Sequence, residues 1–118
     1  MRLTNKTIFF DIDNTICSTR GSDYKNSKPK KKMIKLVNKL YERNKIIFYT
    51  SRYMGRFKSN KTKVLSKYNI TLKQLKNWNV KFDKLIMCKP RYDIFIDDKV
   101  FNNKENFVKK LLIKYEKK

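Results

Sequence analysis

Two short apolar runs in this chain lead directly into carboxylates, although acidic residues are scarce. The chain has 10 Asp and Glu against 31 Lys and Arg. Four of the ten follow the runs Ile8–Phe10 and Ile94–Ile96, and they are Asp11, Asp13, Asp97 and Asp98. Carboxylates gathered at the ends of buried strands cost free energy unless a cation or a proton compensates them. The pattern therefore predicts buried strands that end at a metal site or at a tuned acid/base pair.

The spacing of apolar residues predicts strands that alternate with helices. Strands are expected at 6–12, 46–50, 84–88 and 92–96, and helices at 29–44, 57–68, 71–78 and 107–115. Pro29 suits the first turn of a helix, and Thr71 suits an N-cap. Continuously apolar strands of this kind are typical of a parallel sheet that helices cover on both faces. We therefore expect a single α/β domain over residues 1–118, a length that can bury one core.

The predicted strands end in residues that carry chemistry. In parallel sheets covered by helices, the ligand crevice lies at the carboxyl ends of the strands. The strands stop at Asp11, at Thr50, just before Lys89, and at Asp97. Asp13 is two residues after Asp11, so the period of a strand points both carboxylates to the same side. Carboxylates beside a hydroxyl and a fixed positive charge, with hard oxygen ligands for Mg²⁺, are typical of phosphoryl transfer.

These segments resemble the four motifs of the haloacid dehalogenase superfamily of phosphohydrolases, and they occur in the same order. Asp11–Thr15 is similar to motif one, Ile46–Thr50 to motif two, Lys89–Pro90 to motif three and Ile94–Asp98 to motif four. The resemblance covers nearly the whole chain and implies a Rossmann-like core. Small members similar to capsular-polysaccharide and sugar-phosphate biosynthesis phosphatases share features with residues 49–52, 78–80 and 89–99.

The resemblance implies a catalytic role for each motif residue. Asp11 would be the nucleophile that forms an aspartyl-phosphate. Asp13 would protonate the leaving alcohol and later take a proton from the attacking water. Thr50 and the amide of Ser51 would bind the transferring phosphoryl group. Lys89 would shield the charge that gathers on the nucleophile and the phosphate together.

The resemblance also implies Mg²⁺ as cofactor. Its ligands would be the second carboxylate oxygen of Asp11, the backbone carbonyl of Asp13, and the side chains of Asp97 and Asp98. Asn14 stands where the family most often has Gly, and Asn tolerates a left-handed backbone better than other non-Gly residues. Asn14 is placed on the phosphate-binding side of the site. Arg52 is placed there too, because a guanidinium could grip a phosphate or an acidic group of the substrate.

Ordinary roles stay open for several of these residues. Asp98 could be a turn former, and Lys89 could be one solvated lysine among many. Arg52 could likewise be a surface residue of a very basic chain. Cys17 and Cys88 are interpreted as reduced, small residues in the core or near the site. Because the chain has no His, imidazole zinc sites are excluded and a thiol nucleophile would lack that base.

The chain leaves no room for the cap domain that superfamily members often carry. Only residues 18–28 separate the first strand from its helix, and residues 51–84 are consumed by two helices. The expected site is therefore capless and open. Such a site implies either a large substrate that covers it or a neighbouring subunit that acts as a lid, so a homo-oligomer is one alternative.

The expected function is magnesium-dependent phosphomonoester hydrolysis through an aspartyl-phosphate, on a phosphorylated sugar or a related small metabolite. One alternative is a polynucleotide end-processing phosphatase, in which the net charge of +21 and the open site would hold a nucleic-acid end. Another is a non-catalytic basic module that binds nucleic acid. Against both alternatives, Lys is spread along the whole sequence, as compositional drift would produce.

The sequence also predicts a location. No apolar stretch approaches the roughly 20 residues that a membrane span needs. The first residues lead straight into the first strand, without the apolar core of a signal peptide. We therefore expect a cytoplasmic protein that does not bind membranes.

Overall fold

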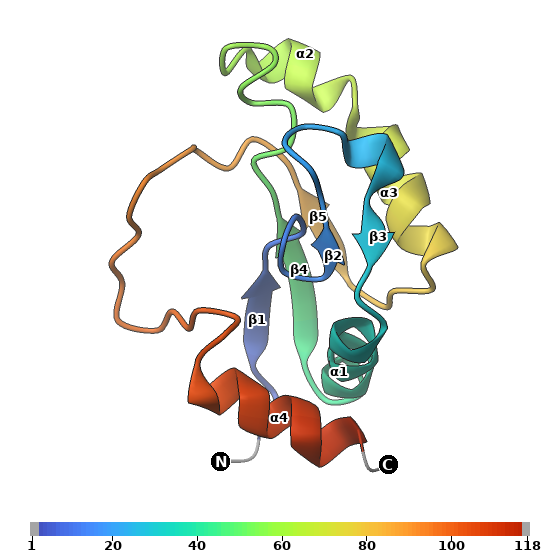
Figure 1. The fold of residues 1–118 in the computed structure, drawn as a ribbon, viewed down its shortest axis with the longest axis vertical. Helices are drawn as coiled ribbons and strands as arrows, with labels where there is room; N and C mark the ends of the chain where they lie inside the picture. Colours follow the sequence, from blue (N-terminus) through green and yellow to red (C-terminus); the bar gives the residue numbers. More distant parts are fainter. Residues whose placement is uncertain (1–2, 117–118) are drawn as a thin grey trace.

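The fold is built on a three-stranded parallel sheet in the order β1–β4–β5 (Figure 1). The structure is a computed structural model, and it describes residues 3–116. Strand β1 is Thr7–Phe10, β4 is Lys45–Tyr49 and β5 is Lys84–Ile86. The first three predicted strands are therefore confirmed, and together with the helices they make an α/β fold.

The two faces of this sheet differ in burial, because side chains alternate along each strand. On one face, Ile46 and Phe48 of β4 are fully buried in the core. On the other face, Phe9 of the edge strand β1 is 54% exposed, although its neighbour Ile47 of the central strand β4 is 6% exposed. The Phe9 ring packs edge-on against Tyr49, with the ring centroids 6.0 Å apart.

A two-stranded antiparallel hairpin follows β1. Strand β2 is Cys17–Ser18, β3 is Lys28–Pro29, and the short 3-10 helix η1 between them is Tyr24–Asn26. The sequence predicts only a loop at 18–28. It does not reveal β2 and β3, because a strand of two residues is too short to leave a periodic pattern. Pro29, predicted in the first turn of a helix, lies in β3 instead, and the helix begins two residues later.

Four α-helices complete the described chain. Helix α1 is Lys31–Tyr41, α2 is Lys61–Leu65, α3 is Tyr68–Asn77 and α4 is Asn106–Glu116. Helix α1 packs on β4 and on α4, and it buries Met33, Ile34, Leu36, Val37 and Leu40. No helix among residues 3–116 is long and apolar enough to cross a membrane.

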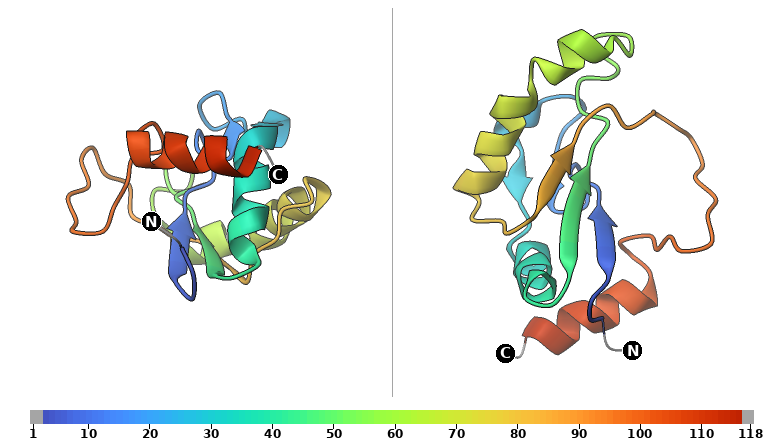
Figure 2. Two further views of the ribbon diagram at one scale, coloured as in Figure 1. Left: turned by 90° about the horizontal axis from the view of Figure 1, so that it is seen from below. Right: turned by 180° about the vertical axis from the view of Figure 1, so that it is seen from behind.

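The helices do not cover both faces of the sheet, and that prediction is wrong. Seen from behind, the three strands lie in front, and no helix of the described chain crosses over them (Figure 2). The chain moves across the sheet in one direction, from β1 through α1 to β4 and then through α3 to β5. Right-handed crossovers that advance in one direction place their helices on the same face.

The predicted fourth strand at 92–96 is also wrong. Residues 91–102 form a loop that leads from β5 to α4 and bulges away from the sheet (Figure 1). Ile94 is 79% exposed and Ile96 is 91% exposed. An apolar run becomes a strand only when a neighbouring strand accepts its hydrogen bonds, and within residues 3–116 β1 pairs with β4 alone. Local apolarity does not determine that long-range pairing.

The segment before α3 also differs from its prediction. In place of one helix at 57–68, turns lead into the short helix α2, whose N-cap Asn60 accepts a hydrogen bond from the Lys63 amide at 3.1 Å. Thr71, the predicted N-cap of the next helix, lies inside α3. Its side chain is fully buried, and its hydroxyl has no hydrogen-bond partner among the described residues.

This unpaired hydroxyl leads to a stability prediction. Thr71→Val should raise the free energy of unfolding by about 1 kcal/mol, because it replaces a buried, unpaired hydroxyl by a methyl group of similar size. Urea denaturation followed by circular dichroism measures the change. Thr62→Val, at an exposed position of α2, is the control and should change stability by less than about 0.5 kcal/mol. A lower stability of Thr71→Val would contradict the prediction.

Candidate active site

The carboxyl ends of the three parallel strands bring predicted site residues to one edge of the sheet. Asp11 directly follows β1, Thr50 directly follows β4, and Lys89 comes shortly after β5. The Lys89 amide donates a hydrogen bond to the Thr50 carbonyl at 3.0 Å. The Lys89 ammonium lies 3.8 Å from Oδ1 of Asp11. The structure therefore brings together the carboxylate, the hydroxyl-bearing residue and the cation that the sequence places at these ends.

Asp11 and Lys89 form a partly buried ion pair. The Asp11 side chain is 41% exposed, and that of Lys89 is 15% exposed. Burial raises the pKa of the Asp11 carboxyl above its ordinary value, and the nearby ammonium of Lys89 opposes this effect. A partly exposed carboxylate beside a cation can attack an anionic phosphate, because the cation offsets the charge of both groups.

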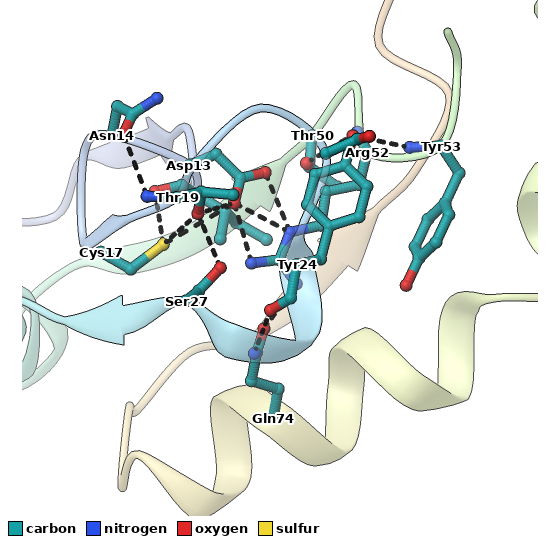
Figure 3. Close-up of polar contacts among 12 residues, drawn as sticks. Asp13, Asn14, Cys17, Thr19, Tyr24, Ser27, Thr50, Arg52, Tyr53 and Gln74 are labelled. Carbon is teal, nitrogen blue, oxygen red and sulfur yellow. Dashed lines mark hydrogen bonds and ion pairs between the residues drawn. The ribbon is translucent and has the colours of Figure 1, made fainter. Parts of the chain in front are cut away.

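Asp13 is held by donors from two neighbouring segments (Figure 3). Nε of Arg52 donates to Oδ2 at 2.9 Å, and Nη2 donates to Oδ1 at 2.9 Å. The Thr19 hydroxyl donates to Oδ1 at 2.6 Å. Sγ of Cys17 lies 3.7 Å from the same oxygen, so the prediction of a cysteine near the site is confirmed. Both oxygens of Asp13 are thus engaged.

The Arg52 side chain contacts other residues of the protein. The sequence predicts instead that it contacts the phosphate of the substrate. Its side chain is 1% exposed. Nη1 donates to Oε1 of Gln74, and the guanidinium lies 5.0 Å from the centroid of the Tyr24 ring. Nε2 of Gln74 in turn donates to the Tyr24 carbonyl at 2.7 Å. These contacts connect η1 and α3 with the ends of β1 and β4.

Asn14 has the left-handed backbone that the sequence predicts, with φ of 61°. Its side-chain oxygen accepts a hydrogen bond from the Thr19 amide at 3.1 Å. Its carbonyl accepts a hydrogen bond from Asn103 at 2.8 Å. The Asn14 side chain therefore closes the turn after β1, and a contact to the substrate phosphate stays a prediction.

Thr50 and Ser51 form the turn after β4. Thr50 is 1% exposed, and its hydroxyl accepts a hydrogen bond from the Arg52 amide at 3.1 Å. The Ser51 hydroxyl donates to the Pro90 carbonyl at 3.5 Å. Within residues 3–116, the Ser51 amide has no hydrogen-bond acceptor, so it is available to an oxygen of a ligand.

Asp97 and Asp98 are not brought together with the other predicted metal ligands. Both are exposed in the loop that leads to α4. In the described part of the chain, no three Asp, Glu or Cys side chains gather as a metal ion would require. The predicted grouping depended on a fourth strand at 92–96, and the structure has a loop there.

Three residues at the site carry little signal in the sequence. Thr19 and Tyr24 belong to a polar loop, and Gln74 belongs to a helix rich in polar side chains. The one available hint is Tyr24, because an aromatic residue in a polar loop often anchors that loop to the rest of the fold. Hydrogen bonds across 50 residues, such as that from Gln74 to Tyr24, leave no local pattern.

Comparison with known proteins supports the fold. The chain is similar to the crystal structure of an MCSG target from Vibrio cholerae, with a TM-score of 0.77. Sequence identity is 23%, over 92% of this chain and 98% of that chain. At this identity the likeness shows the fold alone. No protein-family model and no curated protein matches the chain.

Proposed function

We propose that this chain is a phosphomonoester hydrolase of the haloacid dehalogenase superfamily, with a Rossmann-like core and Asp11 as its nucleophile. The observation that carries the proposal is the pair of Asp11 and Lys89, 3.8 Å apart at the carboxyl edge of the parallel sheet. The turn after β4 adds an available amide at Ser51. This combination suits an anionic phosphate, and the motifs occur in the superfamily's order.

The proposed reaction has two steps. An oxygen of Asp11 attacks phosphorus, the bond to the leaving alcohol breaks, and Asp13 gives its proton to the leaving oxygen. Water then attacks the aspartyl-phosphate, Asp13 takes a proton, and phosphate leaves with Asp11 restored. Lys89 offsets the charge on the transferring group, and the Ser51 amide holds one of its oxygens. Asp13 starts this cycle protonated; in its ionised form, between the two proton transfers, it lies close enough to Asp11 for its charge to raise the pKa of Asp11.

Magnesium is the cofactor that the family resemblance implies, and the described residues do not fit a site for it. The carboxylate of Asp13 is engaged by Arg52 and Thr19, so Asp13 could offer a metal only its backbone carbonyl, as the resemblance implies. Asp97 and Asp98 lie exposed in the loop after β5. The steps above therefore use no metal. The effect of magnesium on the rate is measured in the experiment below.

The proposed substrate is a phosphorylated sugar or a related small metabolite, on the subfamily resemblance. Between β1 and α1, the described chain holds only the β2–β3 hairpin with η1, so no cap domain closes this side of the site. An open site is compatible with a second copy of the chain acting as a lid. It also keeps the nucleic-acid alternative open, since the net charge is +21.

We expect the purified protein to release phosphate from p-nitrophenyl phosphate and to prefer sugar phosphates to phosphorylated oligonucleotides. Colorimetric phosphate assays at two salt concentrations, with magnesium or with a chelator, measure these rates. A preference for oligonucleotides with a steep loss at high salt would favour the nucleic-acid alternative. Phosphate release by an acid-quenched, heat-denatured sample serves as the blank. No release from any phosphate ester would overturn the proposed function.

A further inference from the structure

Among the described residues, Arg52 is the largest side chain that the fold buries completely, and it is a cation in a chain with a net charge of +21. A buried charge costs free energy unless it is paired and hydrogen-bonded. Here Nε and Nη2 donate to Asp13, and Nη1 donates to Gln74. A charged residue that serves only solubility would lie on the surface. Arg52 is buried instead, and it pairs with the Asp13 carboxylate of the candidate active site.

The contact fixes the orientation of that carboxylate. Arg52 presents two parallel N–H groups, and each engages a different oxygen of Asp13 at 2.9 Å. A planar fork of this kind sets the plane of the carboxylate as well as its position. The Asp13 side chain is 20% exposed, whereas that of Arg52 is 1% exposed. Arg52 therefore binds Asp13 from the interior of the protein, and part of the Asp13 side chain stays accessible to a substrate.

Arg52 is itself held in place. The Tyr24 ring lies 5.0 Å from its guanidinium, close enough for a cation–π contact. Gln74 accepts a hydrogen bond from Nη1 and donates one to the Tyr24 carbonyl. Gln74 thus links α3 directly to η1 through the Tyr24 carbonyl, as Figure 3 shows, and its other amide atom accepts from the guanidinium.

We propose that Arg52 is the positioning residue of Asp13, and that Gln74 fixes Arg52 in the geometry that this task needs. The inference rests on the proposed function, in which Asp13 handles the proton of the leaving group. Arg52 acts through Asp13 and does not touch the substrate. It follows that a change at Arg52 weakens proton transfer and leaves phosphate binding intact.

This role has a kinetic signature that a general structural defect lacks. An alkyl phosphate releases a strongly basic alkoxide unless an acid protonates it, whereas p-nitrophenolate leaves without a proton. The ratio kcat/KM reports steps up to departure of the leaving group. A mispositioned Asp13 should therefore lower kcat/KM for glycerol 2-phosphate much more than for p-nitrophenyl phosphate. Inhibition by inorganic phosphate should change little.

The test compares Arg52→Lys and Gln74→Ala with the control Arg56→Lys on both substrates. Arg56 lies on the same turn and stacks on the same Tyr24 ring at 5.8 Å, but it is exposed and does not contact Asp13. We expect Arg52→Lys to lower kcat/KM about a hundredfold for glycerol 2-phosphate and less than about fivefold for p-nitrophenyl phosphate. Gln74→Ala should show the same selective loss, smaller in size. Arg56→Lys should match the unaltered protein.

A double-mutant cycle tests whether Arg52 works through Asp13. In the Asp13→Asn background, Arg52→Lys should lower kcat/KM for glycerol 2-phosphate by less than about twofold. The reason is that Asp13→Asn already abolishes the proton transfer on which Arg52 acts. Equal losses on both substrates, or weaker inhibition by phosphate, would overturn the positioning role. Gln74→Ala keeps the ion pair and supplies the same comparison if Arg52→Lys does not fold.

The outcomes separate this inference from the proposed function. If the unaltered protein shows no turnover that depends on Asp11, the proposed function fails and this role fails with it. If the unaltered protein turns over both substrates and Arg52→Lys lowers both rates equally, only the role of Arg52 fails. A selective loss on glycerol 2-phosphate supports both.

Discussion

Replacing Asp11 with Asn is expected to lower the rate of phosphate release by more than about a thousandfold. The amide has the shape of the carboxylate, but it lacks the negative oxygen that attacks phosphorus. The loss should be the same for every substrate, because no aspartyl-phosphate can form. Release of p-nitrophenolate measures the rate. Mass spectrometry of an acid-quenched reaction should find phosphate on the peptide that contains Asp11 in the unaltered protein and none in the variant.

The same substitution should leave the protein at least as stable as before. Burial is the main cause of the raised pKa of Asp11, so its ionised form costs free energy in the folded state. For an acid with a raised folded-state pKa, this cost is fully present above that pKa and is lost as the pH falls through it. Asn carries no charge and removes the cost. Opposite signs in activity and stability are typical of functional residues.

Asp23→Asn is the matched control for Asp11→Asn. Asp23 is exposed in the loop before η1, where both its oxygens accept hydrogen bonds from Asn26. Its substitution should leave phosphate release unchanged. If Asp11→Asn kept the full rate, or lost it only because the variant unfolds in thermal denaturation, the nucleophile would have to be assigned to another residue.

The strand ends could be predicted from the sequence because their signal is local. An apolar run followed by a polar residue identifies the end of a buried strand, and parallel strands then meet at one edge. Asp11, Thr50 and Lys89 were placed correctly for this reason. The left-handed backbone of Asn14 was predictable for the same reason, since it depends on one residue and its turn.

The remaining features depend on contacts between distant parts of the chain. The run Ile94–Ile96 is as apolar as a strand, but it has no pairing partner, and its two isoleucines are exposed. The partners of Arg52 come from three segments, and their distances along the chain follow no pattern. A sequence with 31 Lys and Arg also gives no sign of which cation is buried. The sequence therefore indicates the candidate nucleophile and leaves its supporting network hidden.

Lys89→Met is expected to lower kcat/KM for phosphate esters by about a hundredfold to a thousandfold. Met keeps most of the length and the apolar character of the side chain, so the substitution removes chiefly the charge. The ammonium lies 3.8 Å from Asp11. In the proposed transition state, the negative charges of the nucleophile and of the phosphate come together beside it. Lys84→Met, at an exposed position of β5, is the matched control and should leave the rate unchanged. A similar rate for both variants would contradict the role of Lys89.

The pH dependence of Lys89→Met distinguishes an electrostatic role from a packing role. Burial raises the pKa of Asp11 and the ammonium opposes this, so loss of the ammonium should raise that pKa further. Asp11 must be ionised to attack, and the rate therefore falls as pH drops through its pKa. The fall should begin at a higher pH in Lys89→Met than in the unaltered protein. Lys89→Arg keeps the charge, so the onset of its fall should stay where it is in the unaltered protein even if its maximal rate is lower.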